Sequence, residues 1–499
     1  MTFFTLGVGD QILIYTQESK NRVRHKALFY AVEALTTNRN QSCCVQRPYV
    51  RNVLDYFLEL GESRDKKEAE EVDINYIQQW EKLHDSCVGM KKAEDLVVCY
   101  LAGPEPKNDF EELISLGVHP KNIWTFENDK NTFKSALQQY SHSEFPQPKI
   151  IKGNIEHFFK DTPKKFDLVY IDACGAIASE KKCLRIIASL CKYHRLSSLG
   201  VIITNFAYPD LSKPTEEDEY SKLIAAYLFF KAHPNTSINE DKMLESDSFK
   251  LFEQEIRKDL DKHYGELITA SIIDISSLAI PIQRFVNSGN AKTLYNNVDD
   301  EFKQIENNSL YNFLSFTSKI NNSKINSLIR EFSGIENFPI DIHKCFKSVH
   351  DFKKGKVELQ PEVSDLLRMV DKELDIHQFL DRPNKGLFLD LIVNQFAYPL
   401  HYNSEAIKRY EYIAKETNMF LDIIVLDECR YIYEWLPTIY QISNAIKNKS
   451  WQYIFRFALD GLVKHRLKYN NEYFFQGSVI SQTVAGFENK IISERKFIE

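Results

Sequence analysis

The sequence predicts an α/β fold, in which a doubly wound and mostly parallel sheet carries large helical additions on its N-terminal and C-terminal sides. Within residues 95–210, short apolar runs alternate with helical patterns, as they do in βαβ units. The runs are rich in Val, Ile, Leu and aromatic residues without strict alternation, which is typical of strands buried on both faces. They cover residues 95–103, 122–127, 148–153, 165–175 and 198–206.

Composition bounds the class of protein. The chain has 499 residues, of which 43% are hydrophobic and 27% are charged. We therefore expect a globular protein of about two to four domains. Its 63 basic and 70 acidic residues give a formal net charge of −7. This balance argues against a broad basic surface for nucleic acid, and leaves a local basic patch open.

The nine cysteines show no C-x-x-C spacing, and several fall inside the expected strands and helices. They are interpreted as reduced, buried thiols of a cytoplasmic protein rather than as a disulfide framework. Adjacent Cys43 and Cys44 leave a redox or metal role as an alternative. Simple burial is favoured because zinc sites use spaced ligands. No metal ligand set is predicted.

The N-terminal residues contain neither a basic segment nor a long apolar segment, so no signal peptide is expected. No apolar run approaches the roughly 20 residues that span a bilayer, so no membrane association is expected. Residues 1–20 resemble a pair of strands. Residues 1–90 as a whole are expected to form a mostly helical cap, with amphipathic helices at 25–35, 47–62 and 74–87.

Within this cap, residues 63–71 form a charge run that is either a solvated helix or a loop. The cap is also locally basic. A phosphate-binding face and ordinary surface charge are the two alternatives, and surface charge is favoured. The basic residues concerned are Arg22, Arg24, His25, Lys26, Arg39, Arg47 and Arg51.

Beyond the α/β core at 91–210, residues 211–385 read as largely helical and form either an insertion or a separate domain. Residues 386–499 are expected to contain a sheet-completing hairpin, followed by aromatic-rich helices over the last 60 residues. The hairpin covers 409–427, with its turn at Lys-Glu-Thr-Asn. A helix over 404–415 is the alternative. If the hairpin joins the sheet, the helical segment before it is an insertion.

Four of the five apolar runs end in small or polar residues, namely Gly103, Glu127, Asp172 and Asn205. In an open parallel α/β sheet, ligands bind beyond the carboxyl ends of the strands. The sequence therefore predicts a pocket lined by these residues.

This layout resembles class I S-adenosylmethionine-dependent methyltransferases over about a quarter of the chain. In that family the first strand ends in a Gly-rich turn beside the methionine part of the cofactor. The resemblance implies S-adenosylmethionine as cofactor, with Gly103 and Glu105 in this turn. The usual G-x-G is replaced by one glycine followed by Pro104 and Pro106, which have no backbone N–H to donate. Asn108 and Asp109 are then expected to open a helix.

The resemblance also assigns the next two strand ends. Glu127 would hold the ribose hydroxyls, because an ionised carboxylate accepts two hydrogen bonds, with neighbouring Asn128 beside it. Asp129 is the fallback for that role. Asn154 would contact the adenine amino group, and an N-cap of the following helix is an equally good interpretation.

The fourth run ends in Asp172-Ala173-Cys174-Gly175, whose D-x-x-G is most similar to the D-P-F-G of tRNA guanine-N2 dimethyltransferases. The resemblance implies that Asp172 holds the target amine and also lies beside the cofactor. Phe206 and Tyr208 are candidates to stack on a flipped base. Core packing is the alternative for both rings.

The function implied is an S-adenosylmethionine-dependent methyltransferase acting on an amino group of a nucleic-acid base, with RNA or DNA as partner. The alternative is a catalytically inactive, methyltransferase-like scaffold or interaction subunit that binds a protein partner. The degenerate turn at Gly103 favours the alternative. A nicotinamide-linked oxidoreductase is disfavoured, because no G-x-G-x-x-G follows the first strand.

Overall fold

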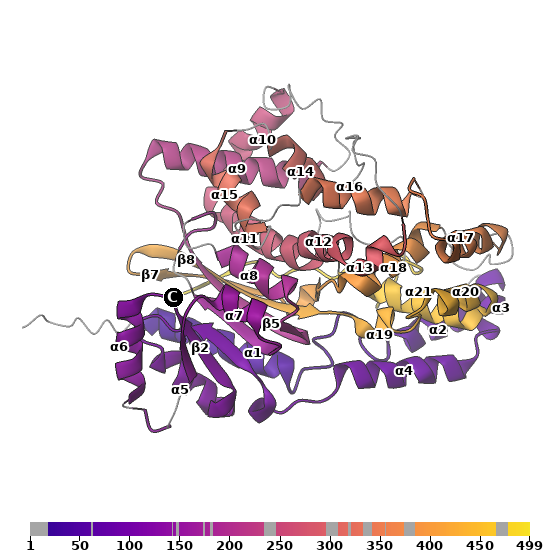
Figure 1. The fold of residues 1–499 in the computed structure, drawn as a ribbon, viewed down its shortest axis with the longest axis horizontal. Coiled ribbons are helices and arrows are strands. Elements are labelled where there is room, and N and C mark those ends of the chain that lie inside the picture. Colours follow the sequence, from indigo (N-terminus) through magenta and orange to yellow (C-terminus); the bar gives the residue numbers. More distant parts are fainter. Residues whose placement is uncertain are drawn as a thin grey trace, which may run out of the picture.

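The structure is a computed structural model in which the described residues form one mixed sheet of nine strands (Figure 1). The strand order is β3-β2-β1-β4-β5-β8-β7-β9, and β6 also pairs with β8. The strands are β1 Val98–Leu101, β2 Ile123–Glu127, β3 Lys149–Lys152, β4 Phe166–Asp172, β5 Leu196–Ala207, β6 His401–Tyr402, β7 Lys408–Ala414, β8 Thr417–Asp427 and β9 Lys496–Ile498. The residues described are 18–60, 63–141, 143–145, 149–172, 175–179, 183–233, 246–295, 308–317, 321–332, 342–354, 356–373, 385–465 and 478–499.

Helices precede, connect and follow the strands. Those before and between the parallel strands are α1 Glu18–Leu35, α2 Tyr49–Leu60, α3 Ser63–Glu70, α4 Ile74–Val88, α5 Lys107–Ser115, α6 Lys130–Ser141, α7 Ile155–Asp161 and α8 Cys183–Lys192. Those between β5 and β6 are α9 Pro214–Ala232, α10 Asp247–Lys258, α11 Leu260–Asp274, the π-helix η3 Ile275–Ala279, α12 Ile280–Asn287, α13 Gly289–Lys292, α14 Ser309–Thr317, α15 Ser323–Phe332, α16 Ile342–Lys353, α17 Pro361–Glu373 and α18 Lys385–Ala397. After β8 come α19 Arg430–Tyr433, α20 Ile439–Lys447 and α21 Lys449–Val463.

Strands β1 to β5 are parallel in the order 3-2-1-4-5, which is the doubly wound arrangement, so the expected fold class is confirmed. Each strand begins and ends within three residues of its apolar run. The central strand β4 is buried along nearly its whole length. Burial on both faces explains why the runs lack alternation.

The hairpin, rather than the alternative helix, follows the helical segment. β8 pairs antiparallel with β5 from Leu199 opposite Asp427 to Ala207 opposite Met419, and β7 pairs antiparallel with β8. Lys415 and Glu416 form the two-residue loop, with φ of 48° and 71°. Positive φ at both positions is the geometry of a type I′ hairpin turn. The helices from α9 to α18 are therefore inserted, in chain order, between two neighbouring strands of one sheet.

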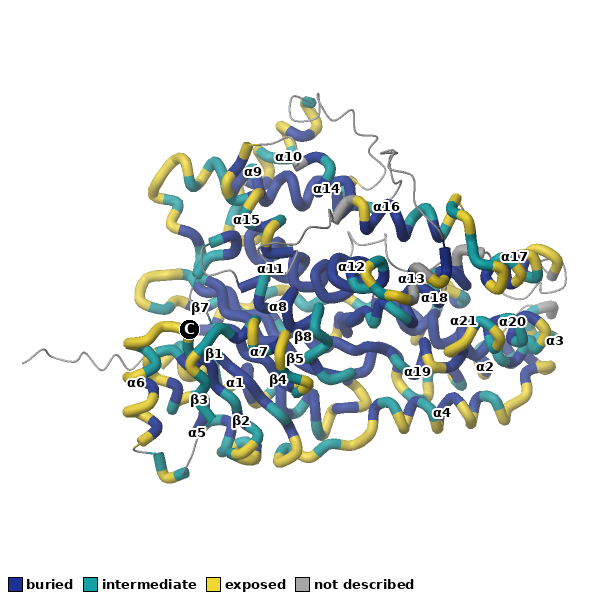
Figure 2. The backbone as a smooth tube through the Cα atoms, in the orientation of Figure 1, coloured by how far each residue is buried: buried dark blue, intermediate teal, exposed yellow. Residues whose placement is uncertain are grey.

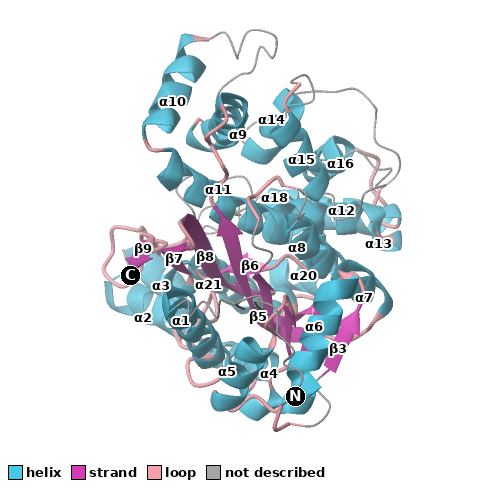
Figure 3. Cartoon of the chain, turned by 90° about the vertical axis from the view of Figure 1, so that its left-hand side faces the viewer, coloured by secondary structure: helices cyan, strands magenta, loops and turns pink. Residues whose placement is uncertain are grey.

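Helices cover both sides of the sheet (Figure 3). α1 packs against β5, β7, β8 and α5. On the other side of the sheet, α8 contacts α7, α11 and η3. The charge run at 63–71 forms the solvated helix α3. The strand pair expected at residues 1–20 lies almost wholly outside the described residues.

The expectation for the last 60 residues is only partly met. Helices α20 and α21 form, but residues 478–499 contain no helix and end in β9, which adds in parallel to the edge of β7. Side-chain contacts account for this course, because Arg409 donates to the carbonyl of Ser493 and Arg495 donates to that of Tyr410. Neither contact is visible in a local sequence pattern.

A long apolar helix is part of the protein core. The continuous helical stretch Leu260–Asn287 has 28 residues and a mean hydropathy of 1.4 in its most apolar window, so by length and composition it could cross a membrane. However, 94% of that window is buried inside the protein. Figure 2 shows this helix dark blue over most of its length, between the sheet and the other inserted helices. Packing against protein therefore explains its composition.

A buried polar seam joins this helix to the sheet. Asp422 of β8 is fully buried, pairs with Arg495 Nη1 at 2.7 Å and accepts a hydrogen bond from Thr269 at 2.5 Å. Gly265 makes room for the guanidinium, because a Cβ there would lie 2.8 Å from Arg495 Nε. The extended C-terminal segment thus anchors α11 to the outer strands.

We expect Arg495→Ala to lower the free energy of unfolding by about 3 kcal/mol, because it leaves the Asp422 carboxylate buried without its cation. Urea denaturation measures the change. Arg368→Ala is the matched control, since its pair with Asp365 is exposed and its loss should cost about 0.5 kcal/mol or less. Equal effects of the two substitutions would contradict the role assigned to Arg495.

Candidate functional site

The best-defined polar cluster lies at the carboxyl ends of β4 and β5. Asp172, the last residue of β4, pairs in register with Asn205 of β5. The Asn205 amide donates to Asp172 Oδ1 at 3.1 Å and to the hydroxyl of Tyr412 on β7 at 2.8 Å. Two predicted strand-end residues are therefore brought together. The intervening Ala173 and Cys174 of the D-x-x-G sequence lie outside the described residues.

Helix α1 brings two cations to this edge. Lys20 Nζ lies 3.0 Å from Asp172 Oδ2, and Arg24 Nε lies 2.8 Å from Asp109 Oδ1 of α5. Both pairs are largely shielded from solvent, with 12–24% of each side chain exposed. Lys20 was not among the predicted site residues. The only sequence signal for it is its i, i+4 spacing from Arg24 on one helix face.

Burial sets the electrostatics of this cluster. It raises the pKa of the Asp109 carboxyl from 3.8 to about 6, and the charge of Asp172 adds to this effect, while Arg24 and Lys20 oppose it. The pKa of Arg24 is raised, because attraction to Asp109 and Asp172 outweighs its own burial. Burial also raises the pKa of the Tyr170 hydroxyl far above its ordinary value. The cluster combines two acids and two cations in a poorly solvated space.

The turn after β1 is fixed by a side chain of the strand itself. Gly103 has φ of 59°, a left-handed conformation that favours glycine. The hydroxyl of Tyr100 donates to the carbonyl of Pro106 at 2.7 Å, which ties the turn to the strand. Glu105 is exposed and accepts from the Asn108 amide at 3.3 Å.

The start of the next helix differs from the expectation. α5 begins at Lys107 with Pro106 as its N-cap, and no side chain caps it. Asn108 and Asp109 therefore lie inside the first turn rather than opening the helix. Asp109 points to Arg24 instead of capping backbone amides.

Glu127, the last residue of β2, takes part in a turn with the residues that follow it. Glu127 is partly buried, and its Oε1 accepts the backbone N–H of Asp129 at 2.8 Å. Asn128 is exposed. Asp129 accepts from the N–H groups of Asn131 and Thr132 at the start of α6, and these hydrogen bonds lower its pKa. Asp129 thus has a structural role, and Glu127 stays the predicted ribose ligand.

Asn154 adopts the capping alternative. Its Oδ1 accepts the N–H of Glu156 at 2.8 Å and caps α7, so contact with adenine stays a prediction for its amide nitrogen. Phe206 is 1% exposed and packs in the core, so burial favours the packing alternative over base stacking. Tyr208 is partly exposed and meets Tyr264 edge-on at 5.4 Å. Of these two rings, Tyr208 is the accessible one.

The basic residues of the helical cap are mostly neutralised by acids. Ion pairs join Arg22 to Glu18, Arg24 to Asp109, Arg47 to Asp85 and Arg51 to Glu81, and the His25 ring lies within hydrogen-bond distance of Glu112. Arg39 is buried and donates to the carbonyls of Val88 and Leu35. This pairing favours ordinary surface charge over a phosphate-binding face.

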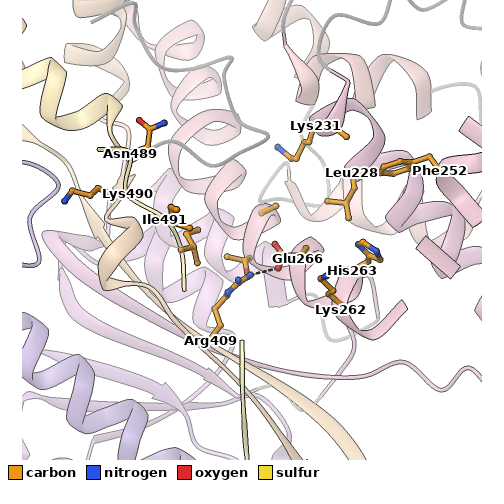
Figure 4. Close-up of a pocket in the computed structure, with 14 residues that line it drawn as sticks. Leu228, Lys231, Phe252, Lys262, His263, Glu266, Arg409, Asn489, Lys490 and Ile491 are labelled. Carbon is orange, nitrogen blue, oxygen red and sulfur yellow. Dashed lines mark hydrogen bonds and ion pairs between the residues drawn. The ribbon is translucent and has the colours of Figure 1, made fainter. Parts of the chain in front are cut away.

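A cavity of about 580 Å³ lies away from the strand ends, between α9, α11, β7 and residues 489–492. Figure 4 shows Arg409 reaching Glu266 across one wall, with Lys231 and Phe252 on the opposite side. The residues lining this cavity include none of those predicted from the strand ends. The cavity lies between the inserted helices, β7 and the C-terminal segment.

Comparisons with known proteins give distant structural matches. No known protein family and no curated protein matches the chain. A candidate caffeoyl-CoA O-methyltransferase from Staphylococcus aureus matches at 15% identity over 44% of this chain and 88% of its own, with a TM-score of 0.19. The magnesium protoporphyrin IX methyltransferase from Synechocystis matches at 15% identity over 32% and 73%, with a TM-score of 0.18. A plantazolicin methyltransferase matches at 13% identity over 57% and 90%, with a TM-score of 0.20. At these TM-scores, the fold assignment rests on the strand order alone.

We expect Asp109 to make stability depend on pH. Because its folded-state pKa lies above the unfolded value, its ionised form is penalised at neutral pH, and this penalty decreases as the pH falls from about 6 towards 3.8. Lowering the pH from 7.5 to 5.0 should therefore add about 1 kcal/mol through this residue. Urea denaturation at both pH values should show that Asp109→Asn loses this increment.

Asp365→Asn, an exposed acid on α17, is the control and should keep the wild-type dependence. An unchanged pH dependence in Asp109→Asn would show that Asp109 titrates normally.

Proposed function

We propose that the protein is an S-adenosylmethionine-dependent methyltransferase that acts on an amino group. The observation that carries the proposal is the ion pair between Lys20 and Asp172 at the carboxyl edge of a 3-2-1-4-5 sheet. An acid at that position which already binds an ammonium nitrogen at 3.0 Å has the chemistry needed to hold an amine substrate. Ligands of such sheets bind at this edge.

The cofactor would be held by the remaining strand ends. Glu127 is suited to the ribose hydroxyls, Asn154 to adenine through its amide nitrogen, and the backbone at Gly103 to the methionine part. Glu105 and Asn128 are exposed flanking residues of the same site. S-adenosylmethionine supplies a methyl group that is already activated as a sulfonium.

Methyl transfer then requires that the amine is positioned next to the methyl group and that the amine loses a proton. The amine nitrogen forms a bond to the methyl carbon, the sulfur–methyl bond breaks, and S-adenosylhomocysteine leaves. Asp172 would orient the amine and stabilise its positive charge, and the proton would pass to water. Asn205 fixes the orientation of the carboxylate through its 3.1 Å hydrogen bond.

For the methyl acceptor we propose an amino group on a base of RNA or DNA. We also propose that the protein acts in the cytoplasm. The D-x-x-G at Asp172 and the large inserted helical segment support this class, because long nucleic acids need accessory surface. Tyr208 is the accessible ring for stacking on a base. Phe206 keeps its predicted role only if the core around it opens.

The alternative is an inactive scaffold that binds a protein partner. Two features support it. Pro104 and Pro106 remove backbone donors from the turn after β1, and Tyr100 fastens that turn to the strand. Lys20 also forms an ion pair with Asp172, at the place proposed for the amine.

We expect isothermal titration calorimetry to show micromolar binding of S-adenosylmethionine and S-adenosylhomocysteine, and Glu127→Ala to weaken it at least about tenfold through the lost hydrogen bonds. Glu94→Ala, which removes an exposed glutamate before β1, is the matched control. A folded wild-type protein that binds neither compound would favour the scaffold.

We expect Asp172→Asn to reduce methyl transfer to tRNA or DNA at least about tenfold, because the charge that holds the amine is removed. Lys20→Met should raise transfer about fivefold, because the competing ion pair contributes about 1 kcal/mol. Transfer of radiolabelled methyl groups measures both. Lys258→Met removes an exposed ion pair on α10 and should have no effect. Full transfer by Asp172→Asn would remove Asp172 from the mechanism.

A further inference from the structure

A second cluster of chemically competent side chains lies at the opposite edge of the sheet, where β8 ends. Cys44, Asp427 and Cys429 are all buried, and their Sγ and carboxylate oxygen atoms lie within 4.8 Å of one another. Asp427 is the last residue of β8 and pairs with Leu199, near the start of β5. Asp172 of β4 instead pairs with Asn205, near the opposite end of β5. The cluster is therefore separate from the proposed methyl-transfer site.

The backbone around the cluster is held firmly. Asp427 accepts the N–H of Cys44 at 3.0 Å and that of Cys429 at 2.8 Å. The Tyr431 hydroxyl donates to Asp427 Oδ2 at 2.6 Å and accepts the N–H of Val45 at 3.1 Å. These three donors leave one of the four carboxylate lone pairs available, on Oδ1. The contacts of Asp427 fix the backbone of Cys44 and Cys429 beside the acid.

A buried imidazole beside the cluster has the tautomer of a metal ligand. His84 Nε2 lies 2.9 Å from the Val45 carbonyl, which can only accept, so Nε2 carries the hydrogen and Nδ1 has a lone pair. His84 is 1% exposed, and its Nδ1 has no hydrogen-bond partner among the described residues. Its ring packs on Tyr431 with centroids 4.6 Å apart. Metal-binding histidines commonly donate the other N–H to a carbonyl in this way.

We propose that Cys44, Cys429 and Asp427 bind a zinc ion, and that His84 completes the coordination through Nδ1. Two thiolates, one carboxylate and one imidazole are ligands that zinc accepts in tetrahedral sites. His84 is not among the atoms that lie within 4.8 Å, so its coordination requires a shift of its side chain. The soft thiolates favour zinc over magnesium or calcium.

Charge balance permits a metal at this depth. As thiols, Cys44 and Cys429 carry one proton each, and zinc binds them as thiolates. Binding of Zn²⁺ releases these two protons, and the total charge of the buried cluster does not change. Zinc would thus join the segment after α1 to the end of β8, which lie 383 residues apart.

The test uses the full chain, reduced and stripped of metal, and titrated with zinc against a competing chromophoric chelator. We expect about one zinc ion per chain, with a higher melting temperature when it is bound. Cys44→Ala/Cys429→Ala should lose this site. Cys99→Ala/Cys191→Ala removes two equally buried thiols elsewhere and should keep it. His84→Ala should bind at least about tenfold more weakly.

Cobalt titration of the wild-type protein provides a second readout that does not depend on the folding of any variant. A thiolate-to-cobalt charge-transfer band with tetrahedral ligand-field bands is expected. Absence of bound zinc, retention of zinc by Cys44→Ala/Cys429→Ala, or a Cys44–Cys429 disulfide in the isolated protein by mass spectrometry would overturn the proposal. Unchanged affinity in His84→Ala would exclude His84 as the fourth ligand.

Discussion

The antiparallel pairing of β5 with β8 is the interaction on which the rest of the structure depends. It joins residues 199–207 to residues 419–427, and nearly every residue of both strands in this region is buried. The pairing requires the chain between them to leave and return at the sheet, which turns a helical segment of almost 200 residues into an insertion. Loop-closure entropy rises only slowly with loop length, so an insertion of this size costs little more than a short one.

β8 is also the strand to which the distant parts of the chain attach. Two of its buried acids act as anchors. Asp422 binds Arg495 from the C-terminal segment, and Asp427 binds the backbone of Cys44 from the N-terminal segment. A buried carboxylate without partners is unfavourable by several kcal/mol, so each acid strongly specifies the segment that satisfies it. Specific polar contacts on one strand therefore organise both termini of the described chain.

The sequence predicts the parts of the fold that depend on local pattern. The five parallel strands follow from apolar runs, and the hairpin follows from two such runs around a short polar turn. β9 could not be predicted, because three residues at 496–498 carry no pattern and pair only through tertiary contacts.

The same distinction applies to the sites. Glu127, Asp172 and Gly103 are candidates from the sequence because strand ends are visible there, whereas Lys20 is brought to Asp172 by the packing of α1. The capping role of Asn154 was an open alternative, since one Asn suits both a cap and a ligand. Cys44 and Cys429 have no motif spacing at all.

Two features of the structure oppose enzymatic activity, and they differ in how easily a ligand could overcome them. The ion pair of Lys20 with Asp172, whose side chains are 24% and 16% exposed, contributes about 1 kcal/mol, which an incoming amine can recover by making the same contact. The turn at Pro104 and Pro106 is different, because missing backbone donors cannot be restored by any movement. Whether the protein acts as an enzyme therefore depends on the turn after β1, where Gly103 alone keeps the left-handed conformation that lets the backbone approach a ligand. In the proposed enzyme, Lys20 would compete with the acceptor amine and would not block the cofactor.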